Sequence, residues 1–172
     1  MSVEAAVWRT LTDAQRAGWE GLGAQMSRTD SLGQTYYLNG FEAFLSVNLN
    51  KLAAGDTAIT DAPALVSPSA PTLGTLTLTS ASFSLAYTPT PLAAGRRLFV
   101  YCSPQRAAGR AYEGDLRLVH VSAAAAASPA NVLSGYSARF GAPVTGNRIF
   151  LGVSVYDSGF LSGHALMSQV VA

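Results

Sequence analysis

The sequence contains few charged residues. Charged residues make up 12% of its 172 positions, about half of the ~25% usual in globular domains. The net charge is +1, so electrostatic attraction to nucleic acid or to anionic lipid is weak, and we expect neither partner. We expect instead a surface largely covered by copies of the chain or by other proteins. An ordinary β protein rich in Ala, Gly, Ser and Thr is the equally weighted alternative.

Cysteine is almost absent as well. The single Cys102 excludes an intramolecular disulfide framework and any cysteine-rich metal site. It ends the apolar run 98–102, which predicts a small buried hydrophobic residue. No apolar run approaches the ~20 residues of a membrane-spanning helix. The N-terminal residues lack the basic and apolar regions of a signal peptide, so we expect synthesis in a cytoplasm without classical export.

Catalytic signatures are missing too. His120 and His164 are the two histidines, hence the two candidates for a general base. A shared strand face with Leu116 and Leu118 favours a hydrogen-bonded structural role for His120, and His164 falls in a predicted turn. Ser154 is in mid-strand without the second glycine of a nucleophile elbow. Because no phosphate-binding, dinucleotide or calcium motif is present, we expect no enzyme, no cofactor and no metal. A serine or histidine hydrolase is the least favoured alternative.

The strongest pattern in the chain is the alternation over residues 147–157. Ile149, Leu151, Val153 and Val155 fall on one face, which is typical of a strand with one side in a core. Turn-forming residues flank this segment on both sides. Burial of these four side chains contributes ~1.5–3 kcal/mol each. We therefore predict that the rest of the fold is organised around this strand.

Residues 3–55 have a helical pattern instead. Apolar and amphipathic side chains recur at steps of three and four, at Trp8, Leu11, Gln15, Trp19, Leu22 and Met26. Thr12 and Gln15 have the spacing of a capping box. The spacing predicts a break near residues 10–12 and a fresh helix over about 13–25, followed by a polar turn at 27–33.

A second helix is predicted after Asn39, which can cap it together with Glu42. Its apolar stripe consists of Phe41, Phe44, Leu45, Asn48, Leu49 and Leu52, and Gly55 ends it. Asn48 is an amide inside that stripe. We expect it to bond backbone groups of a neighbouring helix or loop, the less favoured alternative being an amide that reads a ligand.

The hydrophobic period then changes. Residues 56–74 contain three prolines and no periodic face, which predicts a partly extended linker. From Thr75 the period is two, with short strands expected near 75–78, 83–87, 98–102, 116–120, 132–140, 147–157 and 166–171. We predict an α+β protein with a helical attachment segment (1–55), the linker (56–74) and an immunoglobulin- or fibronectin-III-like β-sandwich of about seven strands (75–172).

Residues 8–19 resemble the W-x-x-L-T-x-A-Q-R-x-x-W signature of small proteins encoded in tailed-phage and prophage genomes. Those proteins continue with an L-S/N-G-F-x-x-F helix that ends N-x-N-x-L, which residues 38–44 and 48–52 match. A proline-bearing linker and a fibronectin-like region typically follow there. The resemblance covers about residues 7–55 by motif and the rest by architecture. It implies a structural component of the virion and supplies no catalytic residues.

We therefore expect a capsid decoration protein, or a tail or head–tail accessory, whose partners are copies of itself and other virion proteins. The expected assembly interface is Trp8, Trp19, Phe41 and Phe44, because a segment of about fifty residues is too small to bury these rings by itself. The alternative is a receptor- or carbohydrate-binding sandwich that uses loop aromatics, for which the candidates are Tyr112, Tyr136 and Phe160.

Overall fold

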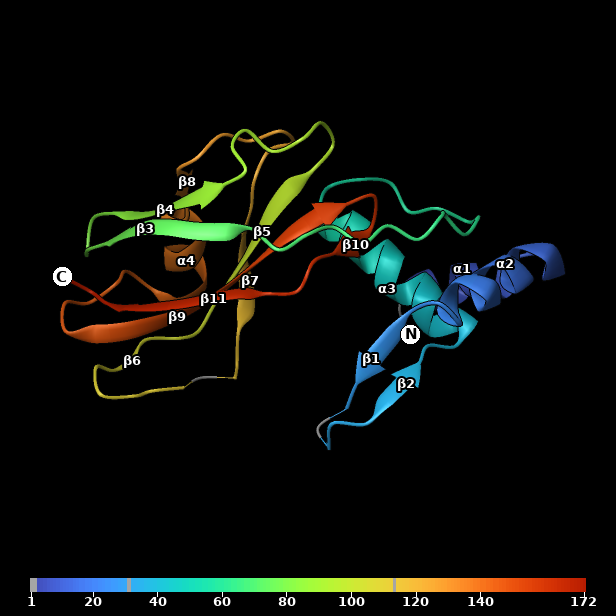
Figure 1. The fold of residues 1–172 in the computed structure, drawn as a ribbon, viewed down its shortest axis with the longest axis horizontal. Helices are drawn as coiled ribbons and strands as arrows, with labels where there is room; N and C mark the ends of the chain where they lie inside the picture. The colour runs from blue at the N-terminus through green and yellow to red at the C-terminus, as the bar shows by residue number, and fades with distance from the viewer. Residues whose placement is uncertain (1–2, 31, 113) are drawn as a thin grey trace. The chain divides into compact units, whose positions relative to one another are not determined.

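The computed structural model describes residues 3–30, 32–112 and 114–172. It combines a few short helices with antiparallel β-sheets, so the chain is α+β and mostly β (Figure 1). The chain divides into two compact units. The first holds the described residues up to Ser67 together with Ser158–Phe160, and the second holds Pro68–Asp157 and Leu161–Ala172.

The helices of the first unit begin where the sequence predicts. The unit consists of α1 (Val3–Thr10), α2 (Asp13–Gly23), the hairpin of β1 (Ser27–Thr29) and β2 (Thr35–Tyr37), and α3 (Gly40–Ala53). The Gln15 N–H donates to Thr12 Oγ1 at 3.3 Å, and the Thr12 N–H donates to Gln15 Oε1 at 3.0 Å. Asn39 and Glu42 form the same box before α3. Both predicted capping boxes are confirmed. A capping box could be predicted because it depends only on residues within one helical turn of each other.

The hairpin and part of the α3 stripe differ from the predictions. The predicted turn at 27–33 is part of a hairpin whose strands have three residues each, too short for an alternation signal. On α3, Phe44 and Asn48 are buried as predicted, but Leu49 and Leu52 are exposed. Val47 is buried in their place. The buried face of α3 is therefore rotated about the helix axis relative to the apolar stripe predicted from the sequence.

Of the predicted linker (56–74), residues 56–67 pack into the first unit, and residues 72–74 already belong to the strand Thr72–Leu78. The Asn48 amide donates from Nδ2 to the Ile59 carbonyl at 3.0 Å and accepts the Ile59 N–H on Oδ1 at 2.7 Å. The Trp19 Nε1–H donates to the Thr60 carbonyl at 2.7 Å. These bonds confirm the structural role predicted for Asn48. Because helix side chains bond the backbone of this segment, its position does not depend on a periodic apolar face of its own.

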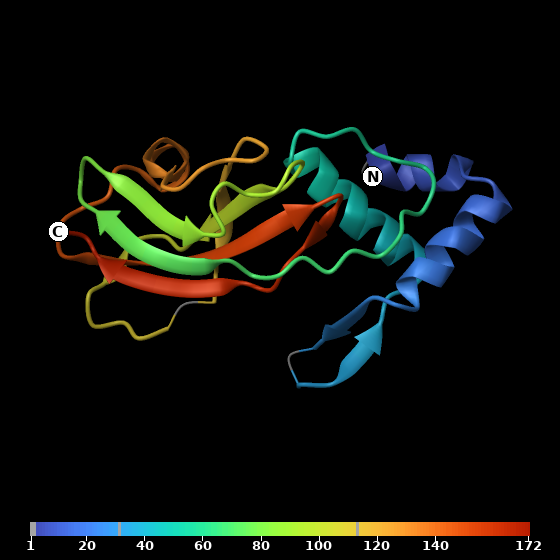
Figure 2. The ribbon, with the colours of Figure 1, turned by 45° about the horizontal axis from the view of Figure 1, so that its top comes forward.

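The second unit contains two antiparallel sheets. β3 (Thr72–Leu78), β4 (Phe83–Thr88) and β8 (Ala130–Asn131) form the smaller one in that order. The larger contains β5 (Arg97–Cys102), β6 (Arg106–Ala107), β7 (Arg117–Val121), β9 (Asn147–Asp157), β10 (Phe160–Leu161) and β11 (Ala165–Val170). Phe160 of β10 belongs to the first unit. β9 is central, with β5 and β6 on one side and β11 on the other (Figures 1 and 2).

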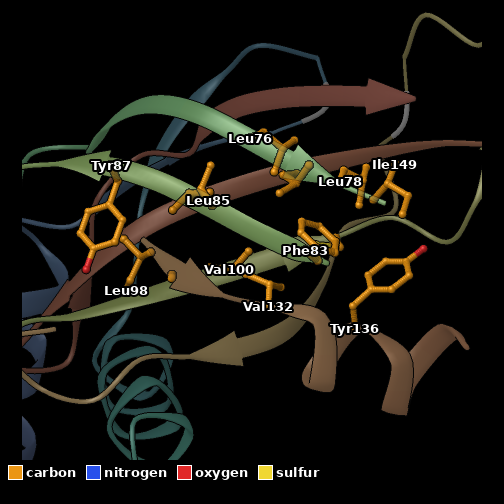
Figure 3. Packing of buried hydrophobic residues seen from close by; sticks show 14 of the residues in the cluster. Leu76, Leu78, Phe83, Leu85, Tyr87, Leu98, Val100, Val132, Tyr136 and Ile149 are labelled. Carbon is orange, nitrogen blue, oxygen red and sulfur yellow. The ribbon is translucent and has the colours of Figure 1, made fainter. Parts of the chain in front are cut away.

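One hydrophobic core joins the two sheets. Ile149, Leu151, Val153 and Val155 of β9 are all buried in it, so the predicted core face of this strand is confirmed. The smaller sheet contributes Leu76, Leu78, Phe83, Leu85 and Tyr87 (Figure 3). Cys102 is fully buried in the same core, as predicted.

The strand predicted over residues 132–140 is wrong, because this segment forms helix α4 (Leu133–Phe140). Val132, Tyr136 and Phe140 all pack in the core, at steps of four rather than two. Gly135 lies against the carbonyl of Val119 on β7, where a Cβ atom would collide with that oxygen. The helix can therefore approach the sheet only with glycine at this position.

Replacing Val153 by alanine should lower the free energy of unfolding of the second unit by about 2 kcal/mol, because it leaves a cavity in a fully buried site. The matched control is Val144→Ala, since Val144 is 55% exposed. Urea unfolding followed by far-ultraviolet circular dichroism measures both. Equal, negligible losses would show that this face of β9 is not in the core.

Candidate functional site

The outer face of the larger sheet brings together side chains that the sequence keeps apart. Phe150, Gly152, Ser154 and Tyr156 of β9 alternate with the core residues and so share this face. A Cβ atom on Gly152 would lie 2.9 Å from Leu116 Cδ1 and 3.4 Å from His164 Cγ. Gly152 thus leaves the space in which residues from two other segments meet over the strand.

Ser154 and His164 form a hydrogen-bonded pair at this place. Ser154 Oγ lies 2.8 Å from His164 Nδ1, and the imidazole meets the ring of Tyr101 edge-on at 4.9 Å between centroids. Burial lowers the pKa of His164 below its ordinary value. The ring is therefore mainly neutral at pH 7. The residue as a whole remains exposed, as its predicted turn position suggested, while the contacts with Ser154 and Tyr101 bury part of its ring.

The geometry of Ser154 and His164 suits a structural contact better than a catalytic pair of nucleophile and base. Ser154 is fully buried in the middle of β9, where the strand pairs with β5 across from Phe99. A hydrolytic serine needs access to substrate and a base oriented by a third group. Among the described residues, His164 has no hydrogen bond other than the one to Ser154. The pair ties the connection between β10 and β11 to the central strand.

His120 has a different environment from the one predicted. A register shift between Val100 and Tyr101 places Val100 opposite His120 but Tyr101 opposite Leu118. The bulge therefore breaks the common face predicted for Leu118 and His120. His120 is half-buried, and burial lowers its pKa. Within the described part of the chain its imidazole makes no hydrogen bond, so the hydrogen-bonded role stays a prediction.

The second unit should lose stability as the pH falls. Both histidines belong to it, and burial lowers both pKa values. Below the ordinary histidine pKa of about 6.5 the unfolded chain therefore binds more protons than the folded chain, which favours unfolding. Its melting temperature should fall from about pH 7.5 to about pH 5, and less steeply in His164→Gln. Tryptophan fluorescence of the first unit, which has no histidine, is the internal control; a flat profile for the second unit would contradict this.

A cavity of about 310 Å³ includes Phe150 of the outer face and Leu116, which also borders Gly152. It is lined by Ala111, Tyr112, Leu116, Phe150, Leu151, Leu166, Met167 and Ser168. Tyr112 is 74% exposed at this cavity. The other two aromatics suggested for a glycan or receptor site cannot serve, because Tyr136 is buried in the core of the second unit and Phe160 in that of the first.

The four residues predicted as the assembly interface lie together, but mostly inside the first unit. Trp19 and Phe44 are fully buried and meet edge-to-face at 5.3 Å. Trp8 is half-buried, with its ring 5.5 Å from Phe41 and 5.4 Å from Phe44. We predicted that residues 1–55 could not bury these rings by themselves. The core of the first unit also contains four residues from outside that segment, Ile59, Ala62, Val66 and Phe160.

An apolar ridge remains uncovered on α3. Phe41, Leu45, Leu49 and Leu52 follow at steps of four, four and three, so they lie along one side of the helix. Phe41 and Leu45 are half-buried, whereas Leu49 is 50% and Leu52 44% exposed. We call these four residues the α3 ridge. It is one exposed apolar surface of the predicted attachment segment, and Leu32, Tyr36 and Tyr37 of the hairpin region are exposed too.

Two further properties bear on partners. No helix in the described ranges is both long and apolar enough to cross a bilayer. Those ranges also contain no group of three or more His, Cys, Asp or Glu side chains placed to hold a metal ion. Compared with protein-family models and with curated proteins, this chain matches none.

Proposed function

We propose that this chain is a non-enzymatic structural protein of a tailed-phage virion, a capsid decoration protein or a tail or head–tail accessory. In this proposal the first unit attaches to the particle through the α3 ridge and the second projects from it. The resemblance of residues 8–19 to the phage signature supports the class of protein. The low charge of the chain supports burial of its surface against other proteins.

The strand pairing supports an immunoglobulin- or fibronectin-III-like sandwich for the second unit. β3 pairs with β4 and β4 with β8, as strands A, B and E do in such folds. β5 pairs with β9 and β9 with β11, as strands C, F and G do. β7 borders β5 in the position of an additional strand C′. Helix α4 then lies in the connection between E and F.

The exposed α3 ridge is the observation that carries the proposal. The largest aromatic side chains of the first unit are used in its own core, yet α3 leaves two neighbouring leucines in water. Burial of such surface against a partner gains about 25 cal/mol per Å². A virion lattice offers a fixed protein surface in many copies, which suits a small apolar contact used repeatedly.

The test is incorporation of the double variant Leu49→Lys/Leu52→Lys into particles of the encoding phage, measured by co-sedimentation. Because both positions are exposed, the fold should persist while incorporation falls at least about tenfold, a loss of ~1.4 kcal/mol in binding. Ala17→Lys on α2 is the control, since this alanine is also exposed. Undiminished incorporation of the double variant would overturn the proposed attachment.

A further inference from the structure

The cavity beside Phe150 in the second unit has the size of an amino-acid side chain rather than of a large ligand. Its volume of about 310 Å³ is at the lower end for small-molecule pockets. Most of its lining side chains are apolar or aromatic, and Ser168 adds a hydroxyl. Two of them are largely exposed, Tyr112 at 74% and Leu166 at 69%. A free molecule would stay partly in water here, whereas a side chain presented by another protein would be covered by its own backbone.

Arg148 is joined to this cavity through Ser168. Its Nη1–H donates to Ser168 Oγ at 3.2 Å, and its Nε–H donates to the Ala108 carbonyl at 2.7 Å. A guanidinium has five N–H donors, so these two bonds leave others for a ligand. Both acceptors are neutral, and in the parts of the chain that the structure describes no ion pair joins Arg148 to a carboxylate. Because the residue is half-buried, a carboxylate beside it would compensate its lost hydration.

The surroundings of Arg148 have an excess of positive charge. Arg106 on β6 is directly opposite Arg148 in the antiparallel register, and like charges so placed repel each other (Figure 1). Arg110 donates from Nε to the carbonyl of Tyr112 at 2.8 Å. Residues 103–117 and Arg148 together contain four arginines and two carboxylates. The whole second unit has seven arginines, no lysine and three carboxylates. A partner complementary to this surface is therefore acidic.

We infer that the second unit binds an acidic segment of another protein at this cavity. An apolar side chain of the segment fills the cavity against Tyr112, and a neighbouring carboxylate accepts hydrogen bonds from Arg148. A guanidinium can hold a carboxylate with two parallel bonds, which also fixes its orientation. A protein is favoured over nucleic acid because four arginines neutralise few phosphates. The contact lies in the second unit, so it goes beyond the attachment proposed for the α3 ridge.

The test titrates the full chain with the peptide acetyl-Gly-Asp-Phe-Asp-Gly-amide and follows the binding by NMR. The wild type should show saturable shifts at Tyr112, Leu166 and Ser168. Two control peptides separate the contributions: glycine in place of phenylalanine leaves the cavity empty, and asparagine in place of both aspartates removes the charge. Each should bind at least about tenfold more weakly. Absence of saturable shifts up to ~5 mM peptide, or equal binding of either control, would overturn the inference.

Variants of the chain test the role of the arginine. Arg148→Gln should weaken binding of the acidic peptide at least about tenfold, whereas Arg148→Lys keeps the charge and should lose less. Arg139→Gln is the matched control, because it removes the same charge from an exposed position on α4. It should bind like the wild type.

Thermal melts show whether each variant is folded, and if Arg148→Gln is not, the peptide controls on the wild type decide. Unchanged affinity of folded Arg148→Gln, an equal loss in Arg139→Gln, or displacement of the peptide by oligothymidylate at equal concentration would overturn the inference. The last result would indicate nucleic acid as the partner.

Discussion

Replacing Gly135 by alanine should destabilise the second unit by about 3 kcal/mol or more, although alanine is the better helix former. The new Cβ atom would collide with the backbone carbonyl of Val119, which cannot turn aside as a flexible side chain can. α4 would have to move away from β7 and withdraw Tyr136 from the core. Urea unfolding followed by far-ultraviolet circular dichroism measures the loss.

Gly21→Ala is the matched control for Gly135→Ala. Gly21 is also helical, on α2, but nothing lies within 4 Å of the position that its Cβ atom would take. This substitution should therefore stabilise the first unit by roughly 0.5–1 kcal/mol. Opposite signs for two glycine-to-alanine changes in helices would isolate the close approach as the cause. A neutral Gly135→Ala variant would mean that α4 does not pack against β7 this closely.

Trp19→Ala should lower the free energy of unfolding of the first unit by about 3–5 kcal/mol. The ring is fully buried, packs edge-to-face on Phe44 and donates its Nε1–H to the Thr60 carbonyl. The substitution removes the ring from the core and leaves that carbonyl without its donor. Fluorescence of Trp8, the other tryptophan, follows the transition because it lies in the same unit.

Trp19→Phe separates the two contributions in this site. Phenylalanine restores most of the packing but cannot donate to Thr60, so its loss should be about 1–3 kcal/mol. The β signal of the second unit should be the same in both variants. A loss below ~1 kcal/mol in Trp19→Ala would contradict the burial of this ring. Failure of Trp19→Ala to enter a particle would then follow from unfolding of the first unit, which is why the α3 ridge gives the sharper test.

The parts of the fold that sequence predicts are those decided over a few neighbouring residues. Thr12 and Gln15 form their capping box, as do Asn39 and Glu42, because each cap closes within one helical turn. β9 is equally local, since the aliphatic residues at every second position from Ile149 to Val155 indicate the face that enters the core. The side chains of its other face are buried as well, which the alternation does not predict. The burial of Cys102 follows from the same period-two pattern on β5.

The sequence was ambiguous where the spacing of apolar residues suited both a strand and a helix. The segment 132–140 carries apolar residues at spacings that suit a short strand as well as two turns of helix. Its helical state depends on Gly135 meeting β7, a contact between positions distant in the chain. Residues 56–67 likewise have no pattern of their own, because Asn48 and Trp19 hold their backbone from other segments.

By itself, the sequence determined the helix caps, the central strand, its core face and the α+β class, because each of these is encoded by residues close together in the chain. The tertiary structure alone decided which apolar residues of the first unit remained exposed to solvent. Trp19 and Phe44 were covered once residues 59–66 folded back, whereas Leu49 and Leu52 were left exposed. It also decided that His164 reaches Ser154. Composition and spacing do not encode such outcomes, because exposure depends on which distant segment packs against a side chain.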